Sequence, residues 1–457
     1  MPYEGEFASY GPLRRLVNSP RVQALLARMN KKAPEQQSSE LPVEHPVTAS
    51  PWIPDLVLAI DGSHIPQPVV NGYPGASIEY LTVAAVLLDL KKLRALDAHR
   101  PVDPRQFRDT ETTASIDEAL PGANVVIDAE LSAPSSLRKT LFELLVNTRM
   151  APDAESLLET YQAILPHKPS THHQECPYDS IDDCPAPDRG YLPAPERYTC
   201  TCHLKRALYS TDALRIHEGM EPAGANGAMF AEIMQVLERL WMIHVLRWLE
   251  SRTFLTTLRR LAIVLDGPLA VFGHPAWLSH AISKELRRLN DEARRVNNGQ
   301  DILLVGIEKT GLFVDHFLNL DQGPRGQQGK LKPRSILLLD DPYIKRNIIY
   351  SQSTKPYGLD TYFGRKFFYK TASGALVVAT LPFLRDGDND TSRAQPTQFP
   401  RLADALSLLD QMVSSRFPNS LVPLVSAHAE AAIPLRLGTR VLEELAKKLM
   451  PEASAVS

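Results

Sequence analysis

The chain has 457 residues, of which 44% are hydrophobic, and a formal net charge of −3. This length allows two or three average domains or one elaborated α/β domain, and the hydrophobic content supports a substantial core. The near-neutral charge excludes a basic field over the whole surface, so any binding of nucleic acid requires a local patch. The first residues lack the basic and apolar regions of a signal peptide, and no apolar run is long enough to cross a bilayer. We therefore expect a cytoplasmic protein without membrane contact.

Residues 11–31 carry the first amphipathic pattern. Apolar residues recur among basic ones at helical spacing, and they are Leu13, Leu16, Val22, Leu25, Leu26 and Met29. This spacing predicts an amphipathic helix. Residues 31–51 are polar and contain prolines, which favours a linker, so we separate residues 1–50 from a domain over residues 51–451. A detached helix has an apolar stripe to bury, which makes it a candidate for docking or dimerisation, or for packing on its own core.

A hydrophobic strand with an acid at its end comes next. Residues 56–64 read Leu-Val-Leu-Ala-Ile-Asp-Gly-Ser-His, which predicts a buried strand that stops at Asp61 and presents a carboxylate there. Residues 73–75 predict a turn, and residues 78–90 predict a long second strand that pairs antiparallel with the first. An Asp-Gly step after a strand is also ordinary turn chemistry, which is the simpler explanation of a single instance.

The next distinctive segment holds every cysteine of the chain. It follows a helical pattern over residues 134–166 and contains Cys176, Cys184, Cys200 and Cys202, with His172, His173 and His203 nearby. Disulfides are not expected in a cytoplasmic protein, and four thiols in so short a stretch favour a structural zinc site. Such a site would staple a proline-rich insertion over residues 168–205, and the histidines offer replacement ligands. The alternative is a loop with unpaired buried cysteines.

Residues 226–251 predict a long helix with a carboxylate on its apolar face. At about 100° per residue, Glu238 lies within an apolar stripe, made by Met234, Trp241, Met242, Val245 and Leu249. A carboxylate buried without a partner is costly, so Glu238 should meet a metal, a cation or a buried donor. Glu232 lies on the polar side of the helix with Arg239 and Glu250, and it remains the alternative to Glu238 as the functional acid of this helix.

A second strand that ends in an acid follows this helix. Residues 261–269 read Leu-Ala-Ile-Val-Leu-Asp-Gly-Pro-Leu and repeat the design of the first strand, this time delivering Asp266. Two acids at the ends of two buried strands suit a divalent-metal site built on a sheet. Residues 276–297 then predict a helix with a basic exposed side, which is typical of a solvated face. Residues 302–307 predict a further buried strand, which ends shortly before Lys309.

Two later segments are candidates for contact with DNA. Residues 323–334 carry four positive charges, three glycines and no carboxylate, which predicts a basic loop that follows a phosphate backbone or a plain flexible connector. Residues 362–381 predict a β-hairpin in which aromatic and basic residues are interleaved, a composition that suits single-stranded DNA and equally an ordinary sheet face. The side chains assigned to DNA contact are Lys330, Lys332, Arg365 and Lys366. Residues 402–415 and 436–449 predict helices, and His428 lies between them.

Four short motifs occur in a characteristic order. They read Ala-Ile-Asp-Gly-Ser, Val-Leu-Asp-Gly-Pro-Leu, Val-Gly-Ile-Glu-Lys-Thr and Pro-Leu-Val-Ser-Ala-His-Ala-Glu-Ala-Ala-Ile. In this order and spacing they resemble the motifs of the NurA family, over roughly residues 50–450. NurA proteins are metal-dependent DNA nucleases with an RNase H-like, Piwi-related core, and they work with a HerA-type hexameric ATPase. The resemblance implies an α/β fold with a mixed sheet flanked by helices, to which this chain adds the cysteine-rich insertion.

The resemblance also implies roles for individual side chains. Two divalent ions bridged by carboxylates make water nucleophilic and hold the charge of the leaving oxygen. Asp61 and Asp266 would be the central ligands, Glu238 a ligand of one ion, and His428 a late ligand or proton-handling residue. Oxygen ligands favour Mg²⁺ or Mn²⁺ over Zn²⁺, and one imidazole shifts the preference toward Mn²⁺. Lys309 would neutralise phosphate charge beside the ions.

We therefore expect a divalent-metal-dependent deoxyribonuclease that acts with a HerA-type hexameric translocase in DNA end resection or anti-phage defence. The chain has no Gly-x4-Gly-Lys-Ser/Thr pattern, so energy for movement along DNA must come from a partner. We also expect a homodimer. Two alternatives remain open. One is a non-catalytic adaptor of the same fold that docks DNA or an ATPase, and the other is an RNase H-like enzyme acting on RNA or RNA–DNA hybrids, because nothing in the sequence reads the sugar.

Overall fold

The computed structural model divides the chain into two compact units, residues 1–41 and 42–457. The described residues are 11–29, 48–69, 75–95, 110–129, 131–169, 176–178, 197–200, 205–221, 224–322, 329–413, 421–432, 441–442 and 445. Within these ranges no helix is both long and apolar enough to cross a membrane. The predicted helix over residues 436–449 falls mostly outside them.

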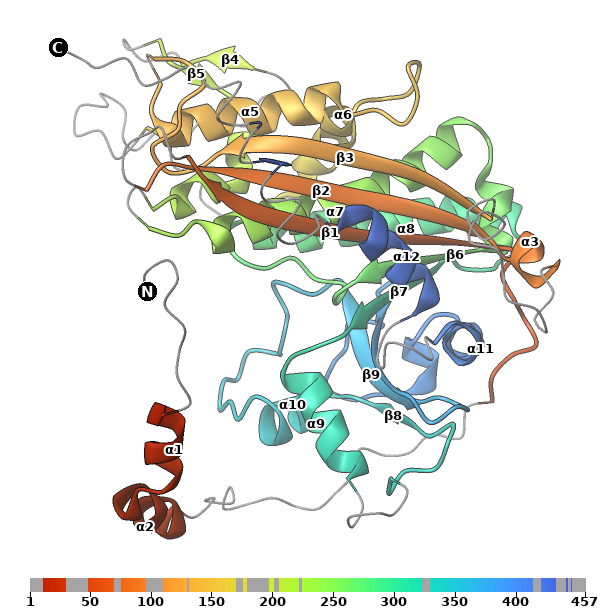
Figure 1. The fold of residues 1–457 in the computed structure, drawn as a ribbon. Coiled ribbons are helices and arrows are strands. Elements are labelled where there is room, and N and C mark those ends of the chain that lie inside the picture. Colours follow the sequence, from red (N-terminus) through yellow and green to blue (C-terminus); the bar gives the residue numbers. More distant parts are fainter. Residues whose placement is uncertain are drawn as a thin grey trace. The chain divides into compact units, whose positions relative to one another are not determined.

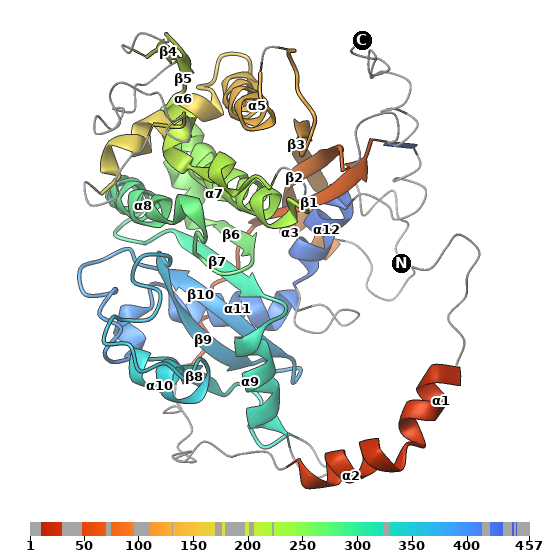
Figure 2. The same cartoon turned by 90° about the vertical axis from the view of Figure 1, so that its left-hand side faces the viewer.

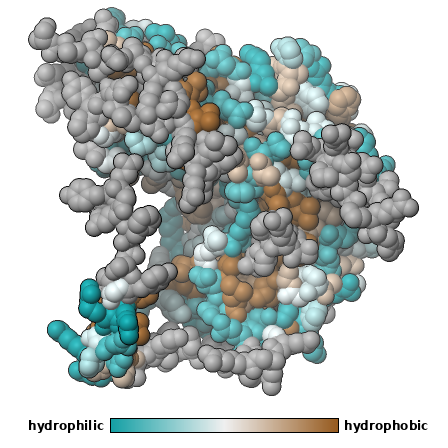
Figure 3. Space-filling model, viewed as in Figure 1, coloured by the Kyte–Doolittle hydropathy of each residue, from teal (hydrophilic) through white to brown (hydrophobic). Residues whose placement is uncertain are grey.

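The smaller unit contains two short helices where the sequence predicts one. They are α1 (Gly11–Val17) and α2 (Pro20–Arg28). The break has a local cause, because the Ser19 hydroxyl accepts a hydrogen bond from the Val22 amide at 3.4 Å and Pro20 occupies the first helical position. No residue of α2 is buried, and Figure 3 shows hydrophobic and hydrophilic residues together on the surface of this unit. The apolar stripe predicted from the sequence is therefore exposed.

The larger unit is built on a mixed sheet of eight strands in the order β3-β2-β1-β6-β7-β10-β9-β8 (Figure 1). The strands are β1 (Leu56–Pro68), β2 (Ser77–Asp89), β3 (Glu111–Pro121), β6 (Leu261–Asp266), β7 (Leu303–Glu308), β8 (Ile336–Leu338), β9 (Gly364–Lys370) and β10 (Leu376–Pro382). Strands β1, β6 and β7 are parallel, and all other neighbours pair antiparallel. Strands β4 (Tyr198–Thr199) and β5 (Ala207–Leu208) form a separate short ribbon.

The first strand is longer than the sequence predicts. It does not stop at Asp61 but continues to Pro68, paired with β2 along its whole length. Antiparallel pairing of β1 with β2 is confirmed. Strand β3 was missed because its residues, Glu-Thr-Thr-Ala-Ser-Ile-Asp-Glu-Ala-Leu-Pro, are mostly polar and form an edge strand with few buried side chains.

Helices cover both faces of the sheet, as the end-on view of Figure 2 shows. Among the described residues, the α-helices of this unit are α3 (Leu90–Ala95), α5 (Ala133–Asn147), α6 (Leu157–Ile164), α7 (Gly227–Ser251), α8 (Leu278–Val296), α9 (Leu312–Asp321), α10 (Asp341–Asn347), α11 (Leu402–Met412) and α12 (Val422–Ala431). The side chains of alternate β1 residues point to opposite faces of the sheet. Leu58 and Ile60 pack in one core with α5 to α8, whereas Val57 and Ala59 pack in another with α11 and α12. A third core joins α9 and α10 to β8, β9 and β10.

Short 3-10 turns complete the chain path. They are η1 (Leu165–His167), η2 (Ser210–Leu214), η3 (Ile216–Gly219), η4 (Leu255–Arg259), η5 (His274–Trp277) and η6 (Pro396–Gln398). Three of them, η3, η4 and η5, contact α7, and η2 contacts α5 and η5.

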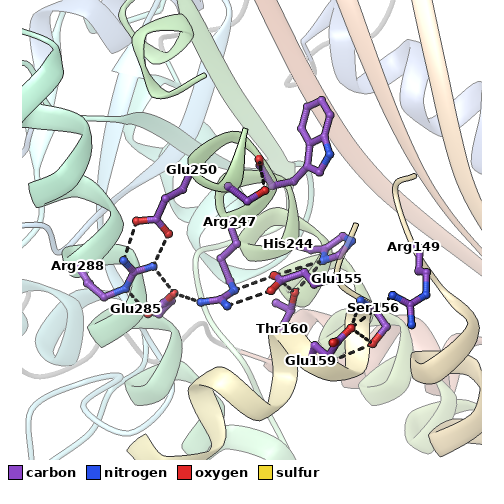
Figure 4. A network of polar contacts seen from close by, with 12 residues as sticks. Arg149, Glu155, Ser156, Glu159, Thr160, His244, Arg247, Glu250, Glu285 and Arg288 are labelled. Carbon is purple, nitrogen blue, oxygen red and sulfur yellow. Dashed lines mark hydrogen bonds and ion pairs between the residues drawn. The ribbon is translucent and has the colours of Figure 1, made fainter. Parts of the chain in front are cut away.

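Helix α7 is buried on nearly all sides, which differs from the predicted amphipathic pattern. All residues from Val236 to Leu246 are buried, so its polar side chains need internal partners. Figure 4 shows one such network, in which Arg247 of α7 bonds Glu155 at 2.8 Å and Glu285 of α8 at 2.7 Å. Arg288 of α8 extends it to Glu285 and Glu250. Part of the basic side of α8 is therefore committed to ion pairs.

Candidate active site

The parallel register of two central strands brings the two predicted acids together. Strand β1 pairs with β6 from Leu56 opposite Leu261 to Ile60 opposite Leu265, so Asp61 and Asp266 are the next residues in register. Asp61 is 1% exposed. Burial and the neighbouring Asp266 carboxylate raise the pKa of Asp61 to about 6, against the opposing effects of Lys309 and His428. Two acids held this close concentrate negative charge at one point.

Lys309 supplies positive charge between the two acids. It follows β7, whose Ile307 pairs with Asp266, and its Nζ lies 2.9 Å from Asp266 Oδ1 and 3.4 Å from Asp61 Oδ2. Burial lowers the pKa of Lys309, but the two carboxylates outweigh burial and raise it overall. The ammonium group therefore stays charged and bridges the acids.

His428, near the end of the sequence, also contacts the Asp61 carboxylate. Its Nδ1 lies 3.2 Å from Asp61 Oδ2, and its side chain is 60% exposed. It does not lie in a connection between helices, because Val422–Ala431 form α12, which packs on β1 and β2. The helix was missed because Ala, Ser and His in this segment leave a weak apolar pattern, although Pro423 in its first turn is a helix-start signal.

Glu238 of α7 approaches the two acids from the other face of the sheet. It is 4% exposed, pairs with Arg239, and accepts a hydrogen bond from the Gly62 amide. Burial raises its pKa to about 8, assisted by Asp61 and Asp266 and opposed by Arg239. Glycine at position 62 permits this approach, because a Cβ there would lie 2.8 Å from the Glu238 Oε1.

The alternative helix acid has a different partner. Glu232 accepts a hydrogen bond from the His274 amide at 3.3 Å, and its carboxylate lies 3.1 Å from the ring nitrogen of His274. Of the two glutamates, Glu238 is the one beside Asp61 and Asp266.

Arg239 is a structural part of the site that the sequence pattern misplaced. The pattern puts it on the polar side of the helix, but the structure buries it. Its guanidinium donates to the carbonyls of Asp266 at 3.2 Å, Pro268 at 3.0 Å and Ala270 at 3.3 Å. Gln235, one turn earlier, accepts a hydrogen bond from the Phe272 amide at 2.7 Å. Helix α7 thus holds the loop after β6 in one conformation.

The acids open into a cleft of about 590 Å³. Its polar lining includes Asp61, Asp266, Glu308, Lys309, Thr310 and His428, and its apolar lining includes Phe272, Leu312, Phe313, Tyr357 and Tyr362. Glu308 pairs with Lys366 and so has a cation of its own. The cleft thus combines carboxylates and one lysine with aromatic side chains, so an anionic, aromatic ligand would need a cation beside the acids.

The side chains assigned to DNA contact occupy two different environments. Arg365 and Lys366 are 3% and 4% exposed. Arg365 donates to the carbonyls of Asp388 and Asp390, and Lys366 pairs with Glu308, so neither presents its charge on an open surface as the prediction requires. The reason is that β9 is covered on both faces, so its basic residues are internal. Lys330 and Lys332 are exposed, whereas residues 323–328 of that loop lie outside the described ranges.

The donor set fits a hard divalent cation. Asp61, Glu238 and Asp266 supply carboxylate oxygens. Burial, and after it repulsion between these acids, raises the pKa of Asp61 and Glu238, an effect that a bound cation would oppose. These acids are not arranged as ligands around one point, because within the described part of the chain no group of three or more His, Cys, Asp or Glu side chains has metal-site geometry. Lys309 lies between Asp61 and Asp266, and Arg239 pairs with Glu238, so an ion would take over the role of these cations.

Only two of the four predicted cysteine ligands of zinc lie among the described residues. Cys176 and Cys200 are both half-buried, and Cys184 and Cys202 lie outside the described residues. Burial raises the pKa of the Tyr198 hydroxyl, with further contributions from Asp212, Cys200 and Cys176. Two cysteines from opposite ends of the insertion therefore lie near the same tyrosine.

Comparisons with known proteins place the chain in a family. A family model described as the NurA domain matches residues 203–433, just over half of the 457 residues. No curated protein matches the chain. Among solved structures, the NurA nuclease from Sulfolobus solfataricus is similar at 10% identity and a TM-score of 0.37, covering 97% of this chain and 98% of that chain. A NurA structure with manganese is similar at 10% identity and a TM-score of 0.27, covering 97% and 100%. The family model confirms the resemblance seen in the sequence motifs, and the chain belongs to the NurA domain family.

Proposed function

We propose that this protein is a divalent-metal-dependent nuclease that hydrolyses phosphodiester bonds of DNA. The observation that carries the proposal is the convergence of Asp61, Asp266 and Glu238 from two parallel strands and a buried helix. Membership of the NurA family supports it. An RNase H-like core is supported by the strand order β3-β2-β1-β6-β7, in which an acid-bearing strand is followed at once by its antiparallel partner.

In this proposal Asp61, Asp266, Glu238 and His428 hold Mn²⁺ or Mg²⁺. The bound ions would supply a nucleophilic water and neutralise the leaving oxygen. The protein's own groups do the rest. Lys309 places a fixed positive charge where a substrate phosphate enters the cleft, and the imidazole of His428, largely exposed beside Asp61, is available to hold a proton.

The test is metal-dependent cleavage by purified protein and by an Asp61→Ala variant. We expect wild-type protein to cut DNA with Mn²⁺ or Mg²⁺ and to be silent in EDTA, with at least about a hundredfold loss in Asp61→Ala because a central ligand is gone. Asp153→Ala is the matched control, since the side chain of this aspartate is 67% exposed and its partner, Arg252, lines neither the cleft nor the second cavity. Undiminished cutting by a folded Asp61→Ala protein would refute the assignment. Matched RNA and RNA–DNA hybrid substrates decide which sugar is accepted.

We further propose a HerA-type hexameric ATPase as partner, a homodimer as the active form, and a cytoplasmic role in DNA end resection or anti-phage defence. The exposed apolar residues of α1 and α2 support a docking role for residues 1–41. Deleting this segment should abolish ATPase binding or dimerisation while cutting of short oligonucleotides persists. Retention of both assemblies by the truncated protein contradicts docking through these helices.

The cysteine-rich insertion is proposed to hold a structural Zn²⁺ ion through Cys176, Cys184, Cys200 and Cys202. The proximity of Cys176 and Cys200 to Tyr198 supports it. Elemental analysis of protein purified without chelator should find about one zinc per chain, as in other four-ligand sites. Protein free of zinc would exclude the site.

A further inference from the structure

A second cavity lies directly behind the wall of the active-site cleft. It has a volume of about 360 Å³, and Tyr357 and Tyr362 line both spaces. The hydroxyl groups of these tyrosines are 2.9 Å apart, and the Tyr357 amide donates to Asp341 Oδ1 at 2.6 Å. The two spaces are therefore separated by a fixed wall of two aromatic side chains.

The charged residues of this cavity favour an anion. Lys284 is exposed and, among the described residues, has no ion pair. Arg287 donates to the Phe383 carbonyl at 3.2 Å and lies 3.5 Å from the exposed Asp386 carboxylate. Arg365 is buried, its guanidinium donates to carbonyls, and its Nε–H has no acceptor. The acid in the lining, Asp341, is already paired with Lys345 at 2.7 Å. The lining thus carries positive charge without matching negative charge.

The remaining walls suit a planar, mostly apolar group. Leu339, Ile344 and Phe383 are buried beside the two tyrosines. Ser283, Asn389 and Thr391 add hydrogen-bonding groups around them. A volume of this size, with apolar walls and a few polar groups, is typical of a small-molecule site. A nucleotide combines a planar base with an anionic phosphate, so it matches both the apolar and the basic residues of the lining.

We propose that this second cavity binds a nucleotide of the same strand whose phosphodiester lies in the Asp61–Asp266 cleft. The inference rests on the proposed nuclease function and adds a binding site to it. A base can enter the cavity only when it is unpaired and unstacked, so the site selects single-stranded DNA or frayed ends. The tyrosine wall then separates the held nucleotide from the bond that is cut.

The experiment compares two variants of the cavity with one control. Lys284→Ala removes the exposed cation of the lining, and Ser283→Trp fills the space. Arg295→Ala is the matched control, because it removes one charge from the same helix, α8, at an exposed site outside the cavity. Thermal unfolding confirms that each variant is folded.

Binding is measured first, in EDTA, with fluorescent single-stranded oligonucleotides of increasing length. For wild-type protein we expect affinity to rise in a step once the strand spans both spaces. Lys284→Ala should weaken the longer strands by about tenfold, as for loss of one charged hydrogen bond, and Ser283→Trp should abolish the step, while Arg295→Ala keeps it. With metal present, the cavity variants should raise KM and leave kcat within about twofold, since the acids are untouched.

Three results distinguish the possibilities. Unchanged binding and KM in both cavity variants, with active wild-type protein, overturns the inference and leaves the nuclease function standing. Absence of cutting by wild-type protein with either metal refutes the proposed function, and the EDTA titrations still decide whether the cavity binds a strand. Titration with free dAMP tests whether the cavity binds a free nucleotide instead of a nucleotide within a strand. Loss of dAMP binding in Lys284→Ala without any effect on oligonucleotides would overturn the strand assignment in favour of a free nucleotide.

Discussion

Ionisation of Glu238 should make the metal-free protein less stable as the pH rises. The pKa of this buried carboxyl is raised from 4.5 to about 8. A group with a raised pKa in the folded state binds its proton more tightly there than in the unfolded chain. Its contribution to stability is therefore complete below pH 4.5 and is lost as the pH rises through about 8. At about 1.4 kcal/mol per pH unit, the loss between pH 5.5 and 8 is about 3 kcal/mol.

The assay is urea unfolding in EDTA at several pH values between about 5.5 and 8.5. Glu238→Gln keeps the shape of the side chain but cannot ionise, so its free energy of unfolding should fall less steeply with pH than that of wild-type protein. Glu232→Gln is the matched control, because Glu232 belongs to the same helix but pairs with His274, and it should keep the wild-type slope. Saturating Mn²⁺ should flatten the wild-type slope, since a bound cation stabilises the ionised carboxylate. Equal slopes for wild-type protein and Glu238→Gln would show that Glu238 is not a buried acid with a raised pKa.

Two substitutions test how the site and its supporting layer are packed. Gly62→Ala places a Cβ within 3 Å of α7 side chains, so we expect a loss of about 1–3 kcal/mol in unfolding free energy and reduced cutting. Gly227→Ala is the control, because nothing lies within 4 Å of its added Cβ, and its stability should be unchanged or higher. Thr160→Val removes the 2.7 Å hydrogen bond to the buried His244 ring, which should lower stability by about 1–3 kcal/mol without changing KM. Urea unfolding and steady-state cleavage measure both effects, and a Gly62→Ala protein as stable and active as wild type would exclude a tight contact between β1 and α7.

The sequence allows the central acids to be predicted because their positions depend on local pattern and strand order. Asp61 and Asp266 each follow a hydrophobic run, and two such runs that become parallel neighbours with aligned register must place the following residues side by side. Glu238 could be recognised because a carboxylate stood within an apolar stripe. These inferences need only one helix or strand at a time, together with the order of elements.

Other features depend on which elements cover one another, and a pattern within one element does not contain that information. Arg239 was assigned to a polar side because its near neighbours on that side are charged, but α7 is enclosed by other elements and the arginine is internal. Arg365 and Lys366 stand next to aromatic residues, a composition that also suits an exposed DNA-binding strand, yet β9 lies between two helical layers. In both cases basic side chains became internal donors to carbonyls or carboxylates and do not form an open basic surface.

The charge balance of the site explains why these internal cations matter. Asp61, Asp266 and Glu238 together would carry three negative charges in a buried setting, and Lys309 and Arg239 supply two positive charges in direct contact with them. Because burial and mutual repulsion raise the pKa of Asp61 and Glu238, full ionisation requires more positive charge than these two residues provide. A divalent cation would provide it and would also free Lys309 to meet a phosphate. The same shortage of positive charge that is expected to lower stability at high pH would favour binding of the proposed ion, so stability and the proposed catalysis would both depend on Glu238.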